Sequence, residues 1–472
     1  MKKWSHILLL TGLLTLLSGC IFLTPDDLYQ LPKRSPGYED LMAAVNTVKK
    51  GLDMEFGTTV ETAVIYSGDN TSNIQLHDMD GDGETETAVT FLRVPGAELP
   101  LRIYFFTKQP DESYEVSRVV ESPGGAAAIY AVDYEELSGE GKKEVIVSWQ
   151  ISTNVYQLGV YSLDSVASDE LVQQGGTGED RGVNTFHEAT ELMTTTYSGY
   201  SLLDIDQDTR MELAVIRLDS AGANSLVELY GWDNGAFSSL GTTRLSTGIT
   251  ALTKVRANFV AEQIAALYIT GTLMDSGQTT DIVVWKNERL VNLTMNRETG
   301  VSNETIRDYI VAPSDVNNDS ILEMPRPHLL PAYHEGISSN WLIDWTQYDL
   351  KGKANRVFTT YHNIIDKWYF EIPDFWVEQI TLKRDDSVSG ERGVVFYHWN
   401  GQDQEPTPFM VIYKLTGGNR TIRAAQGGRF ILAEDDSTIY AAALLASKWD
   451  CGLDETGVRD RFRRTSSGWS NE

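Results

Sequence analysis

The chain has 472 residues, of which 41% are hydrophobic, so it can bury a sizeable core. Acidic residues outnumber basic ones by 67 to 39, which gives a formal net charge of −28. Because phosphate binding relies on Lys and Arg, this balance argues against a nucleic-acid partner, whereas it is compatible with cation binding. The two cysteines, Cys20 and Cys451, cannot form a disulfide framework, and Cys451 is expected to be a free thiol.

Residues 1–19 have the features of a signal peptide. Lys2 and Lys3 precede an apolar run from Ile7 to Leu17, which is shorter than the roughly 20 residues of a transmembrane helix. The run ends in Leu17-Ser18-Gly19-Cys20, which resembles a bacterial lipobox, where the cysteine carries acyl chains such as palmitate and becomes the mature N-terminus. The resemblance implies an anchor on Cys20 that holds the protein at the cell membrane, facing the extracytoplasmic side. An ordinary secretory signal peptide with a chance cysteine is the alternative.

A short tether and a helix are expected next. Residues 20–36 have little periodicity and form the tether. An amphipathic helix is predicted over residues 37–56, with Lys49 and Lys50 toward its end and Gly51 after them as a stop signal. Because its polar face is of mixed charge rather than basic, we expect it to pack on the domain and not on a membrane surface. Its apolar face consists of Tyr38, Leu41, Val45, Val48 and Leu52.

From residue 57 to residue 418 the sequence predicts short strands separated by turns, with an acidic loop that recurs about 40 to 70 residues apart. The strongest copy is the Asp78 loop (residues 78–86), in which Asp78, Asp80 and Asp82 are followed by Gly83 and Glu86. Apolar strands follow most copies. About four strands in each period predict the blades of a propeller rather than a sandwich. The other copies are the Glu136 loop (136–144), the Asp204 loop (204–212), a degraded copy that ends at Asp281, the Asp315 loop (315–323) and an eroded copy at 385–393.

The Asp-x-Asp-x-Asp-Gly-x-x-Glu pattern of the Asp78 loop, with fair copies at Asp204 and Asp315, resembles the FG-GAP or VCBS (integrin-α-like) repeats of bacterial surface proteins. The whole chain resembles a bacterial lipoprotein of that type. The resemblance implies an all-β fold, a β-propeller of six four-stranded blades over residues 57–418. A seventh blade is the alternative, if strands near Phe430 and Ile439 close with a strand near Thr59. Residues 419–472 form a C-terminal extension, with basic residues from Arg459 to Arg464, that is a solvated helix or tail or contributes to the last blade.

Carboxylates at alternate positions around a glycine turn converge on one point, and hard oxygen ligands suit calcium. Glu84 would add its backbone carbonyl to the Asp78 loop. Thr209 and Ser320 replace the turn glycine in the fair copies, so the turn is harder to form there, and the Glu136 loop has Ser138 where a carboxylate is needed. Asx-rich turns without an ion are the alternative. The predicted ligands are Asp78, Asp80, Asp82, Glu84, Glu86, Asp204, Asp206, Asp208, Glu212, Asp315, Asn317, Asp319 and Glu323.

The sequence contains no recognisable catalytic motif. His187-Glu188 lacks the second histidine of a zinc protease, and neither a Gly-x-Ser-x-Gly elbow nor a phosphate-binding glycine loop occurs. The aromatic residues between Trp341 and Trp399 could stack on sugars, and packing between blades is the alternative. We therefore interpret the chain as a surface scaffold or binding protein for an unknown protein or polysaccharide. A polysaccharide lyase or glycoside hydrolase on the same scaffold is the alternative.

Overall fold

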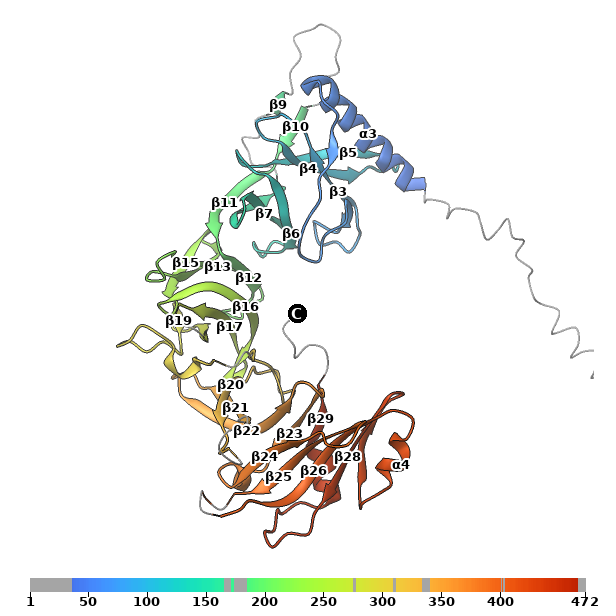
Figure 1. The fold of residues 1–472 in the computed structure, drawn as a ribbon. Coiled ribbons are helices and arrows are strands. Elements are labelled where there is room, and N and C mark those ends of the chain that lie inside the picture. The colour runs from blue at the N-terminus through green and yellow to red at the C-terminus, as the bar shows by residue number, and fades with distance from the viewer. Residues whose placement is uncertain are drawn as a thin grey trace, which may run out of the picture. The chain divides into compact units, whose positions relative to one another are not determined.

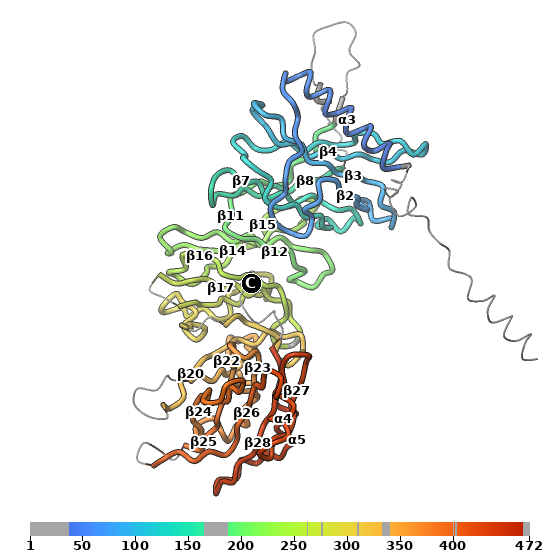
Figure 2. Tube along the Cα trace, turned by 45° about the vertical axis from the view of Figure 1, so that its right-hand side comes forward, coloured from blue at the N-terminus to red at the C-terminus, as the bar shows by residue number. Residues whose placement is uncertain are grey.

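The computed structural model describes residues 36–164, 171–173, 185–274, 277–308, 311–332, 340–399, 401 and 404–465. The predicted signal peptide and Cys20 lie outside these residues. The chain divides into two compact units, traced in Figures 1 and 2. The first consists of Met1–Ile65, Asn70–Ala128 and Asp164–Ala189, and the second of Tyr66–Asp69, Ile129–Leu163 and Thr190–Glu472. Within the described residues, no helix has both the length and the apolar character needed to cross a bilayer.

The first unit is a seven-stranded sheet with one long helix, α3 (Pro36–Phe56). Strands β2 to β5 form an antiparallel meander, β1 also pairs with β3, and β10 pairs in parallel with β5. The strands are β1 (Glu61–Thr62), β2 (Ile74–His77), β3 (Thr87–Arg93), β4 (Leu101–Lys108), β5 (Tyr114–Glu121), β9 (Leu171–Gln173) and β10 (Thr185–Glu188).

Helix α3 packs on this sheet through its predicted apolar face. Leu41, Val45, Val48 and Leu52 are buried in one cluster with side chains of β3, β4 and β5. The stop predicted at Gly51 is wrong, because the helix continues to Phe56 and ends where the amide of Gly57, at φ 64°, donates to the Asp53 carbonyl. Burying Leu52 contributes about 1.5–3 kcal/mol, which outweighs the cost of about 1 kcal/mol for a glycine inside a helix.

The second unit contains five antiparallel sheets that follow one another along the chain, three with four strands and two with five. The β6–β11 sheet is β6 (Ala128–Glu135), β7 (Glu144–Ser152), β8 (Val155–Ser162) and β11 (Thr190–Tyr197). The β12–β15 sheet is β12 (Gly199–Leu203), β13 (Glu212–Arg217), β14 (Leu226–Asp233) and β15 (Ala236–Arg244). The β16–β19 sheet is β16 (Ile249–Val260), β17 (Ile264–Leu273), β18 (Gln278–Trp285) and β19 (Leu290–Asn292).

The last two sheets have five strands each. The β20–β23 sheet is β20 (Met324–Leu329), β21 (Trp341–Tyr348), β22 (Ala354–Asn363) and β23 (Trp368–Ile372), with β29 (Phe462–Arg464) on the edge of β23. The β24–β28 sheet is β24 (Ile380–Asp385), β25 (Glu391–His398), β26 (Thr407–Thr416), β28 (Thr438–Leu444) and β27 (Phe430–Glu434). The short helices are η1 (Ala261–Gln263), η2 (Asn303–Thr305), η3 (Asp374–Trp376), α4 (Arg420–Ala424) and α5 (Glu455–Arg461).

Consecutive sheets of the second unit share apolar cores. Ile146 and Leu158 of the first of these sheets pack with Leu213 and Val215 of the next, and each later pair of neighbouring sheets has its own cluster. Middle strands such as β13 are therefore buried on both faces and form continuous apolar runs rather than an alternating pattern. The predicted all-β class with several four-stranded sheets is confirmed.

The C-terminal residues are built into the last two sheets. β27 and β28 extend the sheet of β26, and β1 pairs with β3, so these strands do not close a seventh sheet with one another in the described part of the chain. The expected solvated helix or tail is wrong for residues 419–465, because apolar side chains of this segment complete a core and two of its arginines form ion pairs with other elements. Arg461 pairs with Glu371, and Arg464 with Asp435.

The aromatic residues that follow residue 340 serve mainly as core. Trp345, Trp368 and Trp376 are at most 1% exposed, and Phe370 is completely buried in one cluster with Trp368 and Trp376. Trp341 remains 39% exposed. Packing between neighbouring sheets therefore accounts for most of this aromatic density.

Candidate metal centres

The Asp78 loop joins β2 to β3 and is held by its own first and last carboxylates. The amides of Gly81 and Gly83 donate to the two oxygens of Asp78, at 2.7 and 2.9 Å. At the other end, Glu86 Oε1 accepts from the amide of Met79 at 3.3 Å. The side chain of Met79 is buried and anchors the loop to the core. These bonds turn the chain so that the acidic side chains face one another.

The same arrangement recurs in the Asp204 loop, which joins β12 to β13, and in the Asp315 loop, which directly precedes β20. Asp204 accepts from the amides of Asp208 and Thr209, both at 3.0 Å. Asp315 accepts from the amides of Asp319 and Ser320, at 3.1 and 2.9 Å. The last glutamate of each accepts from the amide of the second loop residue, at 2.9 Å from Ile205 and 2.8 Å from Val316. The three loops are thus copies of one structure, as the repeat predicts.

All three copies, and the Glu136 loop between β6 and β7, have positive φ at their fourth and sixth positions. Glycine supplies it in the Asp78 loop (Gly81, φ 77°, and Gly83, φ 92°). Thr209 and Ser320 adopt φ 79° and 69° at the sixth position without glycine. The missing glycine therefore changes the energy of the turn rather than its shape, because a left-handed residue other than glycine costs about 1–2 kcal/mol.

Carboxylate oxygens gather in each of the three loops. One oxygen each from Asp78, Asp80, Asp82 and Glu86 lies within 4.8 Å of all the others. Two oxygens bound on opposite sides of a calcium ion at about 2.4 Å each would have this separation. In addition, Glu86 Oε2 is buried and has no hydrogen-bond partner among the described residues, which is costly for a carboxylate oxygen unless a cation meets it. The residues of the Asp78 loop could therefore hold a metal ion.

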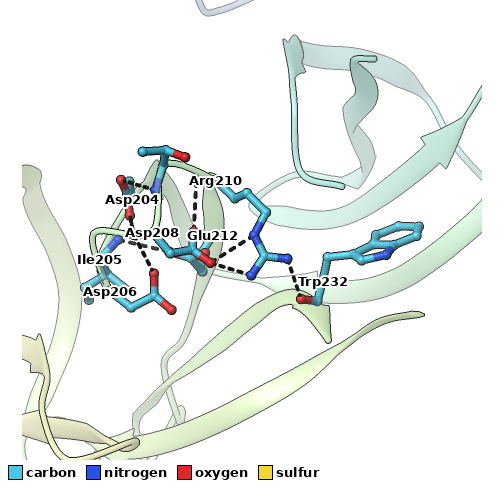
Figure 3. A network of polar contacts seen from close by, with 8 residues as sticks. Asp204, Ile205, Asp206, Asp208, Arg210, Glu212 and Trp232 are labelled. Atoms are coloured by element: carbon cyan, nitrogen blue, oxygen red, sulfur yellow. Dashed lines mark hydrogen bonds and ion pairs between the residues drawn. The ribbon is translucent and has the colours of Figure 1, made fainter. Parts of the chain in front are cut away.

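The Asp204 loop brings together one residue fewer than expected. Asp204, Asp206 and Glu212 have oxygens within 4.8 Å of one another, whereas Asp208 is turned aside. Figure 3 shows the reason: the guanidinium of Arg210 pairs with Asp208 Oδ2, through Nε at 2.9 Å and through Nη2. Arg210 also donates to the Trp232 carbonyl at 3.2 Å. The sequence identifies Asp208 but not this competing arginine.

In the Asp315 loop, Asp315, Asp319 and Glu323 form the cluster. Asn317 lies beside them, where its Oδ1 accepts from the amide of Asp319 at 3.0 Å and its Nδ2 donates to the side chain of the same residue at 2.9 Å. Gln347, a residue of β21 that the pattern misses, donates to Asp319 Oδ2 at 2.8 Å and to Glu323 Oε1 at 2.7 Å. A residue from β21, the strand next to β20 in the same sheet, thus positions two of the candidate ligands.

Burial sets the protonation of the last glutamate in two loops. It raises the pKa of Glu212 to about 7; the hydrogen bond from Ile205 opposes the rise, and the nearby aspartates add to it. Burial likewise raises the pKa of Glu323 to about 7, against the hydrogen bonds from Val316 and Gln347. A proton and a cation therefore compete for these two carboxylates near neutral pH.

The Glu136 loop has the same backbone but no cluster of carboxylates. The amide of Leu137 donates to Glu144 Oε2 at 2.8 Å and that of Gly141 to Glu136 Oε1 at 2.8 Å, while Ser138 occupies the third position. This copy shows that the turn forms without the full acidic set. The backbone geometry is therefore not itself a sign of metal binding.

The prediction of a degraded acidic loop that ends at Asp281 is wrong, because Asp281 belongs to a strand. Asp281 lies inside β18, completely buried, and accepts from Ser246, Asn292 and Ser302 rather than ending a loop. The equivalent connection of that sheet is β16 to β17, where η1 (Ala261–Gln263) makes a short turn.

These connections touch one another along the second unit. A Cβ on Gly139 would lie 2.7 Å from Arg210 Cδ, so Arg210 packs on the Glu136 loop. Gln207 Nε2 donates to the Gln263 carbonyl at 3.0 Å, and Gln263 Nε2 donates to the Asp319 carbonyl at 3.3 Å. The Asp204 and Asp315 loops are therefore joined through the β16–β17 turn of the sheet that lies between theirs.

No protein-family model and no curated protein sequence matches the chain. Solved structures similar to it include the rhamnogalacturonan lyase PL11 of Bacillus licheniformis, at 10% identity and a TM-score of 0.29, over 62% of this chain and 67% of that one. The rhamnogalacturonan lyase YesW matches at 9% identity and a TM-score of 0.29, over 64% of this chain and 68% of that one. Likenesses at this level carry no functional argument.

Proposed function

We propose that the chain is a lipid-anchored, calcium-binding β-propeller protein that faces the extracytoplasmic side of the cell membrane and acts there as a surface ligand-binding or scaffold protein. One observation carries the proposal. The same loop directly precedes a strand in three different sheets (β3, β13 and β20), and in each it gathers carboxylate oxygens within 4.8 Å of one another. Such repetition is difficult to explain by chance turns, because like charges repel one another unless a cation compensates them.

The propeller assignment is supported by the order of the strands. Antiparallel meanders of four strands follow one another along the chain, and in the second unit each shares an apolar core with the next. Sheets that cannot bury both faces alone gain stability from such stacking, as the blades of a propeller do.

Calcium would have a structural role. It would be held by Asp78, Asp80, Asp82 and Glu86 in the Asp78 loop, with Glu84 adding its carbonyl, and by the smaller sets of the other two loops. When bound it would neutralise the clustered carboxylates and fix the connection between two strands. The ligand of the whole protein would be a protein or a polysaccharide rather than a nucleic acid, given the net charge of −28.

Thermal unfolding with and without calcium tests the metal assignment. Extracellular modules bind calcium at about 0.1–1 mM, and a tenfold excess over the dissociation constant stabilises by roughly 1.4 kcal/mol per site. We expect the melting temperature of chelator-treated protein to rise on addition of calcium, and to rise less with magnesium, which needs tighter octahedral geometry.

The double variant Asp80→Ala, Asp82→Ala should lose the share of the stabilisation that belongs to the Asp78 loop. The matched control is Ser138→Ala with Glu140→Ala, the same two positions in the Glu136 loop, which should leave the calcium response unchanged. If calcium does not move the melting temperature of the wild-type protein, these loops are ordinary turns.

The anchor is tested separately. Cys20→Ser should release the protein from membranes or leave it as an uncleaved precursor, because the lipid would no longer be attached. Fractionation of cells that express the variant measures this. A mature-sized Cys20→Ser protein in the membrane fraction would contradict the lipobox interpretation.

A further inference from the structure

Three cations of one sheet converge on a single buried carboxylate, Asp366, in the turn between β22 and β23. Its side chain is 3% exposed. Arg392 Nε lies 3.0 Å and Lys414 Nζ 3.7 Å from Oδ1, and Arg384 Nη2 lies 3.7 Å from Oδ2. Among the described ion pairs, no other carboxylate is shared by three cations, so this cluster departs from the charge pattern of a chain with a net charge of −28.

The strand register places the three cations on one face. Arg384, Arg392 and Lys414 come from the adjacent strands β24, β25 and β26, and Arg392 lies directly opposite Lys414. Like charges directly opposite each other in an antiparallel pair are destabilising. Arg464 lies near this face, with its guanidinium 5.7 Å from the ring of Tyr440, which is opposite Lys414 on the next strand, but its charge is balanced by Asp435 at 2.8 Å.

Asp366 does not neutralise all three positive charges. Its Oδ2 accepts from Asn363 Nδ2 at 3.1 Å, and its Oδ1 makes no hydrogen bond among the described residues. One carboxylate can balance one cation, so an excess of positive charge remains. Arg384 is offset by an aspartate of its own, Asp386 at 2.6 Å, whereas Arg392 and Lys414 have only the shared one in the described part of the chain.

Hydrogen-bond donors of both residues remain unused. The Arg392 side chain is 40% exposed and contacts Asp366 through Nε, which leaves its two terminal nitrogens without a partner in the described chain. The Lys414 side chain is only 14% exposed, yet within the same residues its ammonium makes no hydrogen bond. Both groups contact the same oxygen of Asp366, so the partly exposed guanidinium of Arg392 and the ammonium of Lys414 lie close together.

We propose that Arg392 and Lys414 form an oxyanion site, flanked by Arg384, that binds the carboxylate or sulfate groups of an acidic polysaccharide. A guanidinium fork matches the two oxygens of such a group, and the ammonium supplies a second charge-assisted hydrogen bond. Asp366 is a positioning residue that holds the cations from inside. The polysaccharide assignment rests on the proposed function, whereas the oxyanion site rests on the cluster itself.

Titration of the full mature chain tests the proposal. The probes are sodium sulfate, an alginate oligomer, which carries a carboxylate on each sugar, and a dextran of the same length, which is neutral. Calorimetry at constant ionic strength should show binding of sulfate and tighter binding of the alginate oligomer, with none of dextran. Arg392→Gln and Lys414→Gln should each weaken binding about ten- to a hundredfold, because each removes a charge-assisted hydrogen bond.

Arg289→Gln and Lys351→Gln are the matched controls, since both remove one charge from an exposed turn of the same unit, and they should bind as the wild type does. Arg392→Lys keeps a cation beside Asp366, and therefore the fold, but lacks the fork, so it should also bind more weakly. The proposal is overturned if the wild type does not bind sulfate, or if Arg392→Lys and a folded Lys414→Gln bind it as the wild type does.

Two further results separate this site from the proposed function. Binding of sulfate without binding of the alginate oligomer would overturn the polysaccharide assignment and leave the oxyanion site standing. Binding of both in a protein whose melting temperature does not respond to calcium would support the site while the calcium proposal fails.

Discussion

Thr209 adopts a backbone conformation that is unfavourable for its residue type. A β-branched side chain at φ 79° is strained, and the Thr209 side chain is exposed with no hydrogen bond of its own in the described structure. Only the amide of Thr209 has a role, since it donates to Asp204. The position therefore needs a conformation and not a side chain.

Thr209→Gly should relieve this strain. Left-handed φ costs a residue other than glycine about 1–2 kcal/mol, and the extra freedom of glycine in the unfolded chain returns about half of that. We expect the melting temperature to rise slightly and the Asp204 loop to bind calcium more tightly. Thr209→Ala is the control, because it removes the same side chain without relieving the angle. Equal behaviour of the two variants would contradict the argument.

Glu212 should make stability depend on pH when calcium is absent. Its pKa of about 7 in the folded protein lies above the unfolded value of about 4.3, so the folded state holds the proton more tightly. The stability that this group contributes is complete below about pH 4.3 and is lost as the pH rises through 7. In chelator, Glu212→Gln should therefore stabilise the protein at pH 8, on the order of 1–3 kcal/mol, and change little at pH 5.

With calcium present the sign should reverse, because the variant lacks a ligand of the Asp204 loop. Urea unfolding at pH 5 and pH 8, with calcium and with chelator, measures both effects. Asp233→Asn, which removes a charge at the exposed end of β14, is the control and should show neither. A Glu212→Gln protein that is less stable than the wild type at pH 8 in chelator would show that the ionised carboxylate is not penalised by burial.

At the scale of the element, substitutions to alanine at two neighbouring residues of helix α3 should change its stability in opposite directions. Gly51 lies inside the helix, and a Cβ there would meet no atom within 4 Å, whereas Leu52 is 2% exposed and packs on the sheet. Gly51→Ala should stabilise the first unit by about 0.5–1 kcal/mol, and Leu52→Ala should destabilise it by about 2–5 kcal/mol. Thermal unfolding measures both. A destabilising Gly51→Ala would show that the helix does not extend through this residue in solution.

The acidic loops show what the sequence can predict at this scale and what it cannot. Alternating carboxylates with a turn residue identify the Asp78, Asp204 and Asp315 loops, because the pattern depends on neighbours in the chain. The error at Asp281 arises because a buried aspartate, satisfied by serines far away in sequence, looks the same in the chain as one in a loop. The roles of Arg210 and Gln347 could not be predicted for a related reason. Arg210 pairs with Asp208, a predicted metal ligand, and Gln347 reaches the Asp315 loop from another strand.

At the scale of the whole molecule, the sequence predicts the repeated strands but not how the chain ends. Residues after 418 have no acidic loop to mark their register, yet Phe430, Tyr440, Val458 and Phe462 lie in the core shared by the last two sheets. Their partners are brought together by strand pairing over long sequence distances, which no local pattern reports.

Truncation after Gly418 should therefore prevent the last two sheets from folding. Each of these four side chains contributes about 2–5 kcal/mol when buried, and their sum is as large as the usual stability of a domain, about 5–15 kcal/mol. Limited proteolysis should cut the truncated protein between β20 and β26 and leave the wild type intact there. Truncation after Thr465 is the control and should melt as the full chain does. Resistance of the shorter protein would mean that residues 419–465 are dispensable.

Strand β29 has a consequence for the order in which the protein can be completed. It pairs with β23, although β24 to β28 and α5 intervene between them in the sequence. Because the chain is made from its N-terminus onward, β23 has an unpaired edge from the moment it forms until residues 462–464 have been added. An open edge is the usual starting point for pairing with another copy of the same chain. The protein is therefore most prone to aggregation while it is being synthesised. A chaperone that covers exposed strand edges would matter more then than after folding.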